Sequence, residues 1–297
     1  MKIFKLWEPV SGLILKTVSA LDSFGVEIDE KGKYFHPRED FLAASKKLSI
    51  FAVADGVTLE LNERGSYPKP SGAGAVAKIF CRAIVQEIEK AYSRLTVPGL
   101  KKVFAKANSA VAKYNRSHGR APGRLDYWSY DLFAATAAWA AVKENQVYWS
   151  TLCDSSLACF DGHGRIKFKS PDCWETYRKN LPSDWTKLPE AERKKIARRV
   201  YRNGVNARGE LIGYGVVTGE KAAERYLKYG RFTVDKGDVV FVFSDGFEGY
   251  IGQPDFVKMF ADWSSGLTKK VKVYTADKSL KNPSGFGRER TLIALKF

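Results

Sequence analysis

The sequence contains little cysteine and little histidine, with four cysteines and three histidines among 297 residues. The cysteines form no C-x-x-C pair, and two of them lie in or beside apolar runs, where a reduced thiol behaves as a small hydrophobe. We therefore expect a cytoplasmic protein without disulfides. None of the histidines stands beside a plausible Ser or Cys nucleophile, which argues against a histidine-based catalytic triad. The four cysteines are Cys81, Cys153, Cys159 and Cys173, and the three histidines are His36, His118 and His163.

The chain also lacks an apolar run of about eighteen residues, a fixed-period repeat and a low-complexity segment. These absences argue against a membrane span and against a solenoid. The first residues are interrupted by Trp7, Glu8 and Pro9, so we interpret them as folded protein rather than as a signal peptide. Because 297 residues without a linker suffice for a large core, we expect one domain over residues 1–297.

Acidic residues are the scarcer charge, with 33 Asp and Glu against 49 Lys and Arg and a net charge of +16. The segment from His163 to Arg231 holds seventeen basic and eight acidic residues. Such a surface attracts a polyanion or a phosphorylated partner, although Glu190–Val200 is also typical of a solvated helix face. Aromatic residues are not interleaved there as in a stacking platform, which disfavours specific nucleic-acid binding.

The most informative stretch is Leu48–Gly56, LSIFAVADG. Its apolar run is too short for a good helix and rich in β-branched and aromatic residues, which predicts a strand buried on both faces. Asp55 then lies at the end of that strand. The following Gly56 lets the backbone turn and bring its carbonyl close to whatever the carboxylate holds. Oxygen-rich cation sites are built in this way.

A second stretch of the same kind is Asp238–Gly246, DVVFVFSDG. One Asp-Gly pair alone is typical of a tight turn. Two buried strands that each end in such a pair can bring Asp55 and Asp245 into one cleft. Two close carboxylates need a cation between them or a raised pKa. We therefore favour a metal site over two separate turns.

Three further acids lie beside predicted strands. Glu39 and Asp40 precede an apolar run, and such a pair in a charged loop is usually solvated surface. If that run pairs with the strand that carries Asp55, Asp40 and Asp55 lie near one end of the same sheet. Asp154 lies at a break between two apolar runs, where a turn aspartate that accepts from nearby amides is the simpler interpretation.

Periodicity predicts two helices between two groups of strands, and short connections in the middle third predict antiparallel pairing. Residues 170–215 are polar, basic and irregular, and we interpret them as a flap over a site. The predicted strands are Lys2–Trp7, Leu13–Ser19, Gly25–Ile28, Leu132–Val142, Gln146–Cys153, Ser156–Phe160, Arg165–Lys169, Arg231–Val234, Asp238–Gly246 and Thr291–Phe297. The predicted helices are Ser71–Arg94, Pro98–Ser117, Pro189–Arg202, Gly219–Lys228 and Pro254–Trp263.

The order of these motifs resembles the PPM or PP2C family of metal-dependent Ser/Thr protein phosphatases. The resemblance spans nearly the whole chain. It rests on Glu39-Asp40, FAVADG, the small-residue strand AATAAW, C-D-S at Cys153–Ser155 where the family has G-D-S, FVFSDG and the terminal RTLIAL. It implies an α+β fold, a four-layer α-β-β-α sandwich with two antiparallel sheets inside.

The resemblance also implies two Mg²⁺ or Mn²⁺ ions in a carboxylate cleft. Asp55 would bridge them, the Gly56 carbonyl would complete one coordination sphere, and Asp245 would hold the first ion. Glu39 and Asp40 would act on the second ion, partly through water, and Asp154 matches the acid that helps bind a weaker third ion. Such hard cations prefer oxygen ligands.

Two positions depart from the family pattern. The last metal ligand of the family is an Asp in a terminal D-N or D-D pair, and here the pair is Arg288 and Glu289. Glu289 can substitute one residue along, or the site lacks that ligand. The phosphate-binding Arg of the family corresponds to Phe35, and Arg38 or His36 is our hypothesis for its replacement.

We predict hydrolysis of phosphomonoesters, with phosphoserine and phosphothreonine in proteins as the substrates. An upstream Ser/Thr kinase would produce these phosphorylated proteins. A binding module that keeps the fold without activity, with its basic face as the contact surface, is the main alternative. A basic protein associated with nucleic acid is the third. An acidic partner of the basic segment, at about residues 170–215, is a further hypothesis, and no membrane contact is expected.

Overall fold

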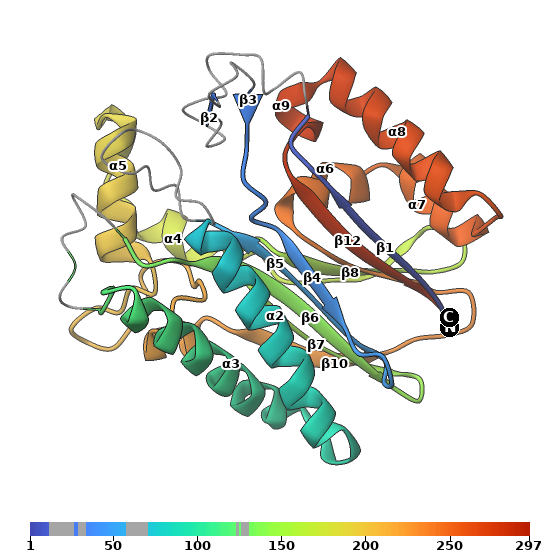
Figure 1. The fold of residues 1–297 in the computed structure, drawn as a ribbon, viewed down its shortest axis with the longest axis horizontal. Helices are drawn as coiled ribbons and strands as arrows, with labels where there is room; N and C mark the ends of the chain where they lie inside the picture. Colours follow the sequence, from blue (N-terminus) through green and yellow to red (C-terminus); the bar gives the residue numbers. More distant parts are fainter. Residues whose placement is uncertain (12–26, 29–33, 58–70, 123–124, 126–130) are drawn as a thin grey trace.

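The computed structural model describes residues 1–11, 27–28, 34–57, 71–122, 125 and 131–297. Two antiparallel five-stranded sheets lie at its centre, and helices cover their outer faces (Figure 1). In order, the first sheet contains β1 (Lys2–Glu8), β12 (Arg290–Lys296), β11 (Val239–Phe243), β8 (Ser156–Phe160) and β9 (Ile166–Lys169). The second contains β10 (Lys228–Thr233), β7 (Gln146–Leu152), β6 (Ala135–Lys143), β5 (Ile50–Gly56) and β4 (Phe41–Ala44).

Three hydrophobic clusters divide the molecule into four layers. The outer face of the second sheet packs under α2 (Gly72–Ala91) and α3 (Val97–Ser117). The outer face of the first sheet packs under α6 (Glu248–Ile251), α7 (Pro254–Asp262) and α8 (Leu267–Lys281). The third cluster lies between the two sheets. This α-β-β-α arrangement confirms the predicted fold class.

The central strand β5 shows how its sequence serves two layers. Ile50, Ala52 and Ala54 point toward α2 and α3, whereas Phe51 and Val53 point toward the other sheet. Because successive side chains of a strand face opposite sides, a strand between two cores must be apolar throughout. The prediction of a doubly buried strand at this position is confirmed.

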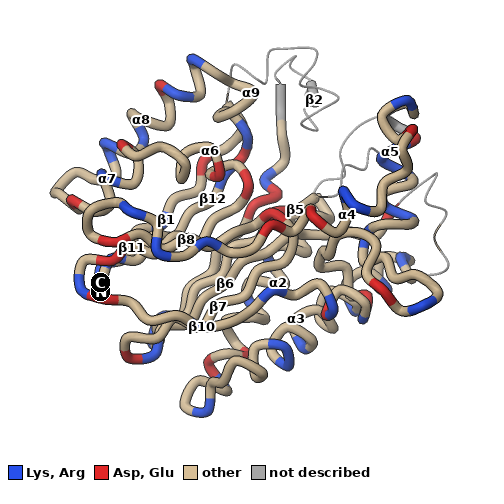
Figure 2. The backbone as a smooth tube through the Cα atoms, turned by 180° about the vertical axis from the view of Figure 1, so that it is seen from behind, with Lys and Arg blue, Asp and Glu red and all other residues tan. Residues whose placement is uncertain are grey.

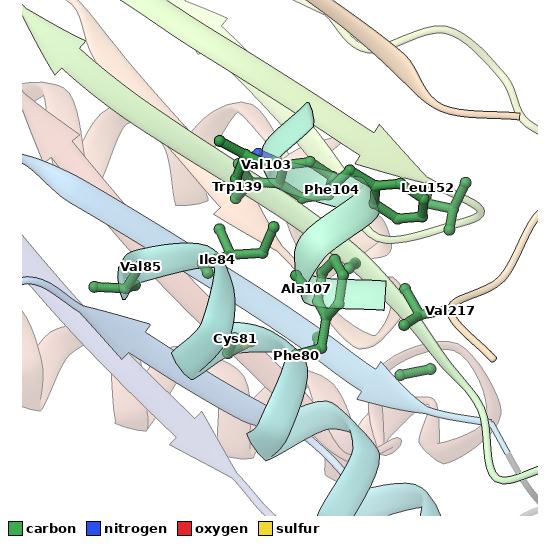
Figure 3. Packing of buried hydrophobic residues seen from close by; sticks show 14 of the residues in the cluster. Phe80, Cys81, Ile84, Val85, Val103, Phe104, Ala107, Trp139, Leu152 and Val217 are labelled. Carbon is green, nitrogen blue, oxygen red and sulfur yellow. The ribbon is translucent and has the colours of Figure 1, made fainter. Parts of the chain in front are cut away.

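The helix layer over the second sheet is held by an aromatic group around Trp139 (Figure 3). The Trp139 ring stacks on Phe104 of α3 at 6.0 Å and meets Phe80 of α2 edge-on at 5.6 Å. Each helix begins with a side-chain cap, Ser71 for α2 and Thr96 for α3, whose oxygens accept from backbone amides of the first turn. These caps help to orient both helices over the sheet.

The basic segment, residues 170–215, contains α4 (Glu175–Asn180), η3 (Trp185–Lys187), α5 (Glu190–Ile196) and η4 (Ala197–Tyr201). Its α5 stands at the edge of the molecule beyond α4 (Figure 1). A helical stretch at Pro189–Arg202 is confirmed as α5 followed by the π-helical turn η4. The segment is anchored by Arg202, whose Nη1 lies 2.6 Å from the Asp131 carboxylate.

Two helix predictions differ from the structure. Gly219–Lys228 contains only the short η5 (Lys221–Arg225), because Lys228 begins β10, which pairs with β7. The helix α8 was not predicted. Its buried positions include the polar residues Thr275 and Ser279, which interrupt the apolar stripe that identifies a helix.

The remaining elements complete the description. The predicted strand Leu13–Ser19 lies outside the described residues, and Gly25–Ile28 is described only as β2 (Glu27–Ile28), which pairs with β3 (Tyr34–Phe35). The first and last strands, β1 and β12, lie side by side with Lys2 opposite Lys296. None of the described helices has the length and apolar content needed to cross a membrane. The short helices η2 (Tyr92–Arg94), η6 (Asp245–Phe247) and α9 (Pro283–Phe286) are the other described elements.

Replacing Trp139 tests the packing of the helix layer. Trp139→Ala is expected to lower the free energy of unfolding by about 3–5 kcal/mol, because it leaves a cavity between α2, α3 and the sheet. Trp139→Phe is expected to cost much less, because none of the described residues accepts a hydrogen bond from the buried indole N–H. Urea unfolding followed by circular dichroism measures both, with Val273→Ala, at a side chain 62% exposed, as the control. A loss below about 1 kcal/mol for Trp139→Ala would contradict this account.

Candidate active site

The β4–β5 hairpin places Asp40 and Asp55 at the same edge of the second sheet. Phe41 pairs with Ala54, so the residues that flank this pair, Asp40 and Asp55, face each other at the end of the ladder. The backbone N–H of Gly56 donates to the carbonyl of Glu39 at 3.2 Å, which continues the pairing by one step. This confirms that the two acids lie near one end of the same sheet.

The first sheet brings Asp245 to this edge, and the end of β7 brings Asp154. Asp245 opens η6 directly after β11, and Asp154 lies two residues after β7. Figure 2 shows acidic residues gathered between the labels of β5 and α6. Asp245 and Asp154 both act on the carboxyl of Asp55 electrostatically, so all four aspartates share one site.

Burial and mutual repulsion favour the neutral form of three of these acids. Burial, and then Asp40 and Asp245, raise the pKa of Asp55 well above its usual range. Burial, and then the nearby Glu289, raise the pKa of Asp40 to about 8. Burial, and then Asp245, raise the pKa of Asp154 to about 7. In the absence of a cation, the site therefore retains protons near neutral pH.

The donor atoms of this site suit a hard divalent cation. Oδ2 of Asp40 accepts from the Ser244 hydroxyl at 2.7 Å, whereas Oδ1 of Asp40 and Oδ1 of Asp154 are buried without a hydrogen-bond partner among the described residues. A buried carboxylate oxygen without a partner is costly, and a cation would satisfy it. Within the described residues, no three His, Cys, Asp or Glu side chains converge closely enough to form a metal-binding group. The carboxylate oxygens are suitable ligands for such ions, but the acidic side chains would have to move closer together to coordinate one.

Arg288 and Glu289 occupy different roles at the start of β12. Nη1 of Arg288 lies 2.9 Å from Oδ2 of Asp245, and the Arg288 side chain is about half exposed. Glu289 is buried, and its carboxylate accepts from Nε1 of Trp7 at 2.7 Å and from the backbone N–H of Glu39 at 3.0 Å. Glu289 thus contacts the backbone beside Asp40, while Arg288 supplies a positive charge to Asp245.

The other predicted residues are also near this edge. The carboxylate of Glu39 is buried and accepts from the Ser71 hydroxyl at the start of α2. The Arg38 guanidinium stacks over the Trp7 ring at 4.4 Å, and its Nε donates to the Asp40 carbonyl at 3.1 Å. Burial lowers the pKa of His36 to about 4, so His36 is neutral at pH 7 and offers no charge to a phosphate.

Gly56 must remain a glycine for the hairpin to approach α2. A Cβ atom at this position would lie 2.7 Å from the carbonyl carbon of Ala73 and 2.8 Å from its Cβ. Real Cβ atoms do not approach other atoms so closely, so the start of α2 would have to move. The Asp-Gly pair of β5 therefore serves packing as well as the site.

Two cavities adjoin the aspartates. The larger, of about 420 Å³, is lined by Asp154, Asp245, Lys169, Cys153, Cys173 and Trp174, among others. The smaller, of about 150 Å³, is lined by Asp154, Trp174 and three charged residues of the basic segment and its anchor, namely Asp131, Arg198 and Arg202. Residues of the basic segment therefore line both cavities beside the candidate site.

Apart from Asp154 and Asp245, sequence reasoning did not identify the residues that line these cavities. Lys169 ends β9, and Trp174, Arg198 and Arg202 belong to the basic segment. The concentration of positive charge in that segment was the available signal, but it does not tell which arginine faces the site. Arg202 is nearly completely buried against Asp131, whereas Arg198 lies 3.3 Å from the same carboxylate and is about one-fifth exposed.

Comparison with known proteins shows the fold. No family model matches the chain, and no curated protein sequence matches it. A serine/threonine phosphatase from S. agalactiae is 10% identical with a TM-score of 0.59, and covers 100% of this chain and 99% of its own. PppA from Pseudomonas aeruginosa is 13% identical with a TM-score of 0.56, and covers 99% of this chain and 96% of its own.

A third similar structure is that of a bacterial enzyme with bound metal. The catalytic domain of the serine/threonine phosphatase PstP, in complex with two manganese ions, is 12% identical with a TM-score of 0.55. That match covers 99% of this chain and 96% of the other. PstP was also solved from Mycobacterium tuberculosis. At such low identity these likenesses establish a PP2C-type fold for this chain, and they confirm the predicted resemblance at that level.

The raised pKa values predict how stability depends on pH without metal. Asp154 is protonated in the folded state up to about pH 7, but in the unfolded state only up to its ordinary value of 3.8. The unfolded state therefore releases this proton first, and the stability contributed by Asp154 falls as pH rises from about 4 to 7. The side chain in Asp154→Asn resembles the protonated acid and does not titrate. As the pH rises from 5 to 8, the free energy of unfolding of this variant is therefore expected to increase by about 2 kcal/mol relative to that of the wild type.

Thermal and urea unfolding in EDTA measure this difference. Asp277→Asn, at an exposed acid of α8 paired with Lys281, is the matched control and is expected to show no such trend. Addition of Mn²⁺ is expected to stabilise the wild type more at pH 8 than at pH 6, because the ion must displace protons. A pH-independent difference between Asp154→Asn and wild type would contradict the assignment of Asp154 to the cluster.

Proposed function

We propose that this protein hydrolyses phosphomonoesters, with phosphoserine and phosphothreonine of proteins as the substrate class. The observation that carries the proposal is the gathering of Asp40, Asp55, Asp154 and Asp245 at one edge of the two sheets. Burial raises the pKa of three of them, and two of their buried oxygens lack a hydrogen-bond partner among the described residues. A fold shared with serine/threonine phosphatases supports the same reaction class.

In this proposal Asp55 would contribute to the binding of two divalent ions, Mg²⁺ or Mn²⁺, and the Gly56 carbonyl and Asp245 would help to hold the first of them. Asp40 and Glu39 act on the second ion, partly through water, and Asp154 serves a weaker third. When bound, such ions acidify a water molecule and shield the charge of the phosphate. The manganese ions bound to PstP, which shares the fold, support this choice of cofactor.

The side chains of the protein position the reactants. Asp55 and Asp245, the proposed catalytic acids, orient the attacking water. Both carboxylate oxygens of Glu289 are engaged, so we assign this residue to holding the Glu39 backbone and the Trp7 ring rather than to an ion. Trp7 in turn carries the stacked Arg38, which we propose as a contact of the phosphoryl group. No protein nucleophile is needed.

The second candidate function is a binding module without hydrolytic activity. The ion pair between Arg288 and Asp245 favours it, because a fixed cation on a proposed ligand competes with a metal ion. The Arg288 side chain is about half exposed, so its attraction to Asp245 is screened by water and worth about 1 kcal/mol or less. The binding free energy of a divalent ion held by several carboxylates is larger than this attraction. We therefore prefer hydrolysis as the function.

The basic segment supports an acidic or phosphorylated protein as the partner. Its arginines border the cavity beside Asp154, so a negatively charged substrate would meet them on the way to the aspartates. Recognition of an acidic protein by this segment and a place in the cytoplasm remain parts of the proposal.

Hydrolysis of p-nitrophenyl phosphate tests the function directly. Purified protein with millimolar Mn²⁺ is expected to turn over, and excess EDTA is expected to abolish turnover. Asp55→Asn and Asp245→Asn are each expected to lower kcat/KM at least about 100-fold, because each removes a charge that the ions require. Asp277→Asn is the matched control, at an exposed aspartate far along α8. Full turnover in Asp55→Asn would contradict the site, and no turnover with any divalent ion would favour the binding module.

Arg288 distinguishes the two candidate functions. If the protein is a hydrolase, Arg288→Ala is expected to lower the Mn²⁺ concentration for half-maximal activity by about 3- to 10-fold, because it removes a competing charge from Asp245. Arg165→Ala is the control, since Arg165 pairs with Asp161 on an exposed hairpin. Isothermal titration with Mn²⁺ gives the same comparison without substrate. An unchanged or weaker Mn²⁺ requirement in Arg288→Ala would show that this arginine does not oppose the metal.

A further inference from the structure

Two of the four cysteines meet beside the candidate site. Cys153 follows β7, is buried and has a positive φ of 61°. Cys173 lies between β9 and α4, is partly exposed and packs with Trp174 against the cluster that contains Cys153. Burial, and then the neighbouring Cys173, raise the pKa of the Cys153 thiol well above its usual range, and both cysteines line the 420 Å³ cavity.

The position of this pair is specific. Cys153 is the residue before Asp154, and Cys153, Asp154 and Trp174 line both cavities. The other two cysteines lie elsewhere, Cys81 under the helix layer and Cys159 between the sheets. The pair therefore forms part of the wall that the basic segment shares with the aspartates.

We propose that Cys153 and Cys173 form a reversible disulfide in the wall of this cavity, and that its formation displaces Asp154 and lowers the activity of the site. The disulfide itself depends only on the two thiols. Its effect on hydrolysis rests on the function proposed above. The expectation of a protein without disulfides then describes the reduced state.

The chemistry requires a low-molecular-weight disulfide, such as oxidised glutathione, as the electron acceptor. The Cys173 sulfur, which is the more exposed, attacks the glutathione disulfide as its thiolate, forms a mixed disulfide and releases one glutathione thiolate. The Cys153 sulfur then attacks the Cys173 sulfur, forms the protein disulfide and releases the second glutathione. Two protein thiols are oxidised, one glutathione disulfide is reduced, and the two thiol protons pass to the two glutathione thiolates.

The bond would change the geometry of the site. A disulfide bond is about 2.05 Å long, which is much shorter than any contact between two thiols that are not bonded to each other. The segment between β9 and α4 and the end of β7 must therefore approach each other. Because Asp154 is joined to Cys153 by a peptide bond, its carboxyl moves with it, and misplacement by about 1 Å is enough to impair catalysis.

Mass spectrometry tests for the bond without reference to activity. The reduced protein is incubated with oxidised glutathione, alkylated under denaturing conditions and digested. We expect a peptide that links Cys153 to Cys173 and a fall in free thiols from four to two. Cys173→Ser should lose the link, and Cys159→Ser, at a buried cysteine of the other cluster, should keep it. Glutathione adducts on Cys173 with no internal link would overturn the proposal.

Activity and metal binding test the consequence. Hydrolysis of p-nitrophenyl phosphate by the oxidised wild type is expected to be at least about 10-fold slower than by the reduced wild type, and dithiothreitol should restore it. The activity of Cys173→Ser should not change with oxidant, and Cys153→Ala provides a second variant if Cys173→Ser folds poorly. A linked protein with unchanged activity would overturn the regulatory effect. A linked protein without hydrolysis in either state would refute the proposed function while the disulfide stands.

Discussion

The organisation of this protein depends on the cost of holding four aspartates at one edge of two packed sheets. Asp40 and Asp55 come from a hairpin of one sheet, Asp245 from the end of a strand in the other, and Asp154 from the end of β7. Burial raises the pKa of Asp40, Asp55 and Asp154 and so disfavours their charged forms, and neighbouring negative charges add to this effect. Only protons, cations or hydrogen-bond donors can relieve this repulsion. Several residues around the site donate hydrogen bonds or positive charge to these aspartates.

The protein supplies part of the relief from its own side chains. Ser244 donates to Asp40, and Arg288 pairs with Asp245 across the start of β12. The charge of Glu289, which would add to the repulsion on Asp40, is partly compensated because Trp7 and the Glu39 backbone donate to its carboxylate. Oδ1 of Asp40 and of Asp154 still lack a partner among the described residues. Because Arg288 already neutralises part of the charge of Asp245, a binding module is the strongest rival function.

The basic segment adds a second level of organisation. Its anchor is the buried pair of Arg202 and Asp131, which holds the end of η4 against the sheet edge. The same segment contributes Trp174 to the lining of both cavities and Arg198 to that of the smaller one, and its Cys173 packs against the cluster that contains Cys153. Arg198 and Arg202 line the smaller cavity and Lys169 lines the larger, so positively charged side chains lie beside Asp154. Substrate recognition and redox control would both act through this segment.

Local patterns in the sequence determined the strands, most of the helices and the acids at the strand ends, because apolar periodicity and Asp-Gly pairs are read within a few residues. The strand around Ile50 and the helix around Phe80 could be predicted in this way. The helix α8 could not, because its buried face includes the polar residues Thr275 and Ser279 and so lacks a continuous apolar stripe. Only the tertiary structure decided that Arg288 contacts Asp245, that Glu289 turns to Trp7 and that Cys173 meets Cys153. Each of these contacts joins residues from separate segments, and their geometry depends on how the two sheets and the basic segment pack.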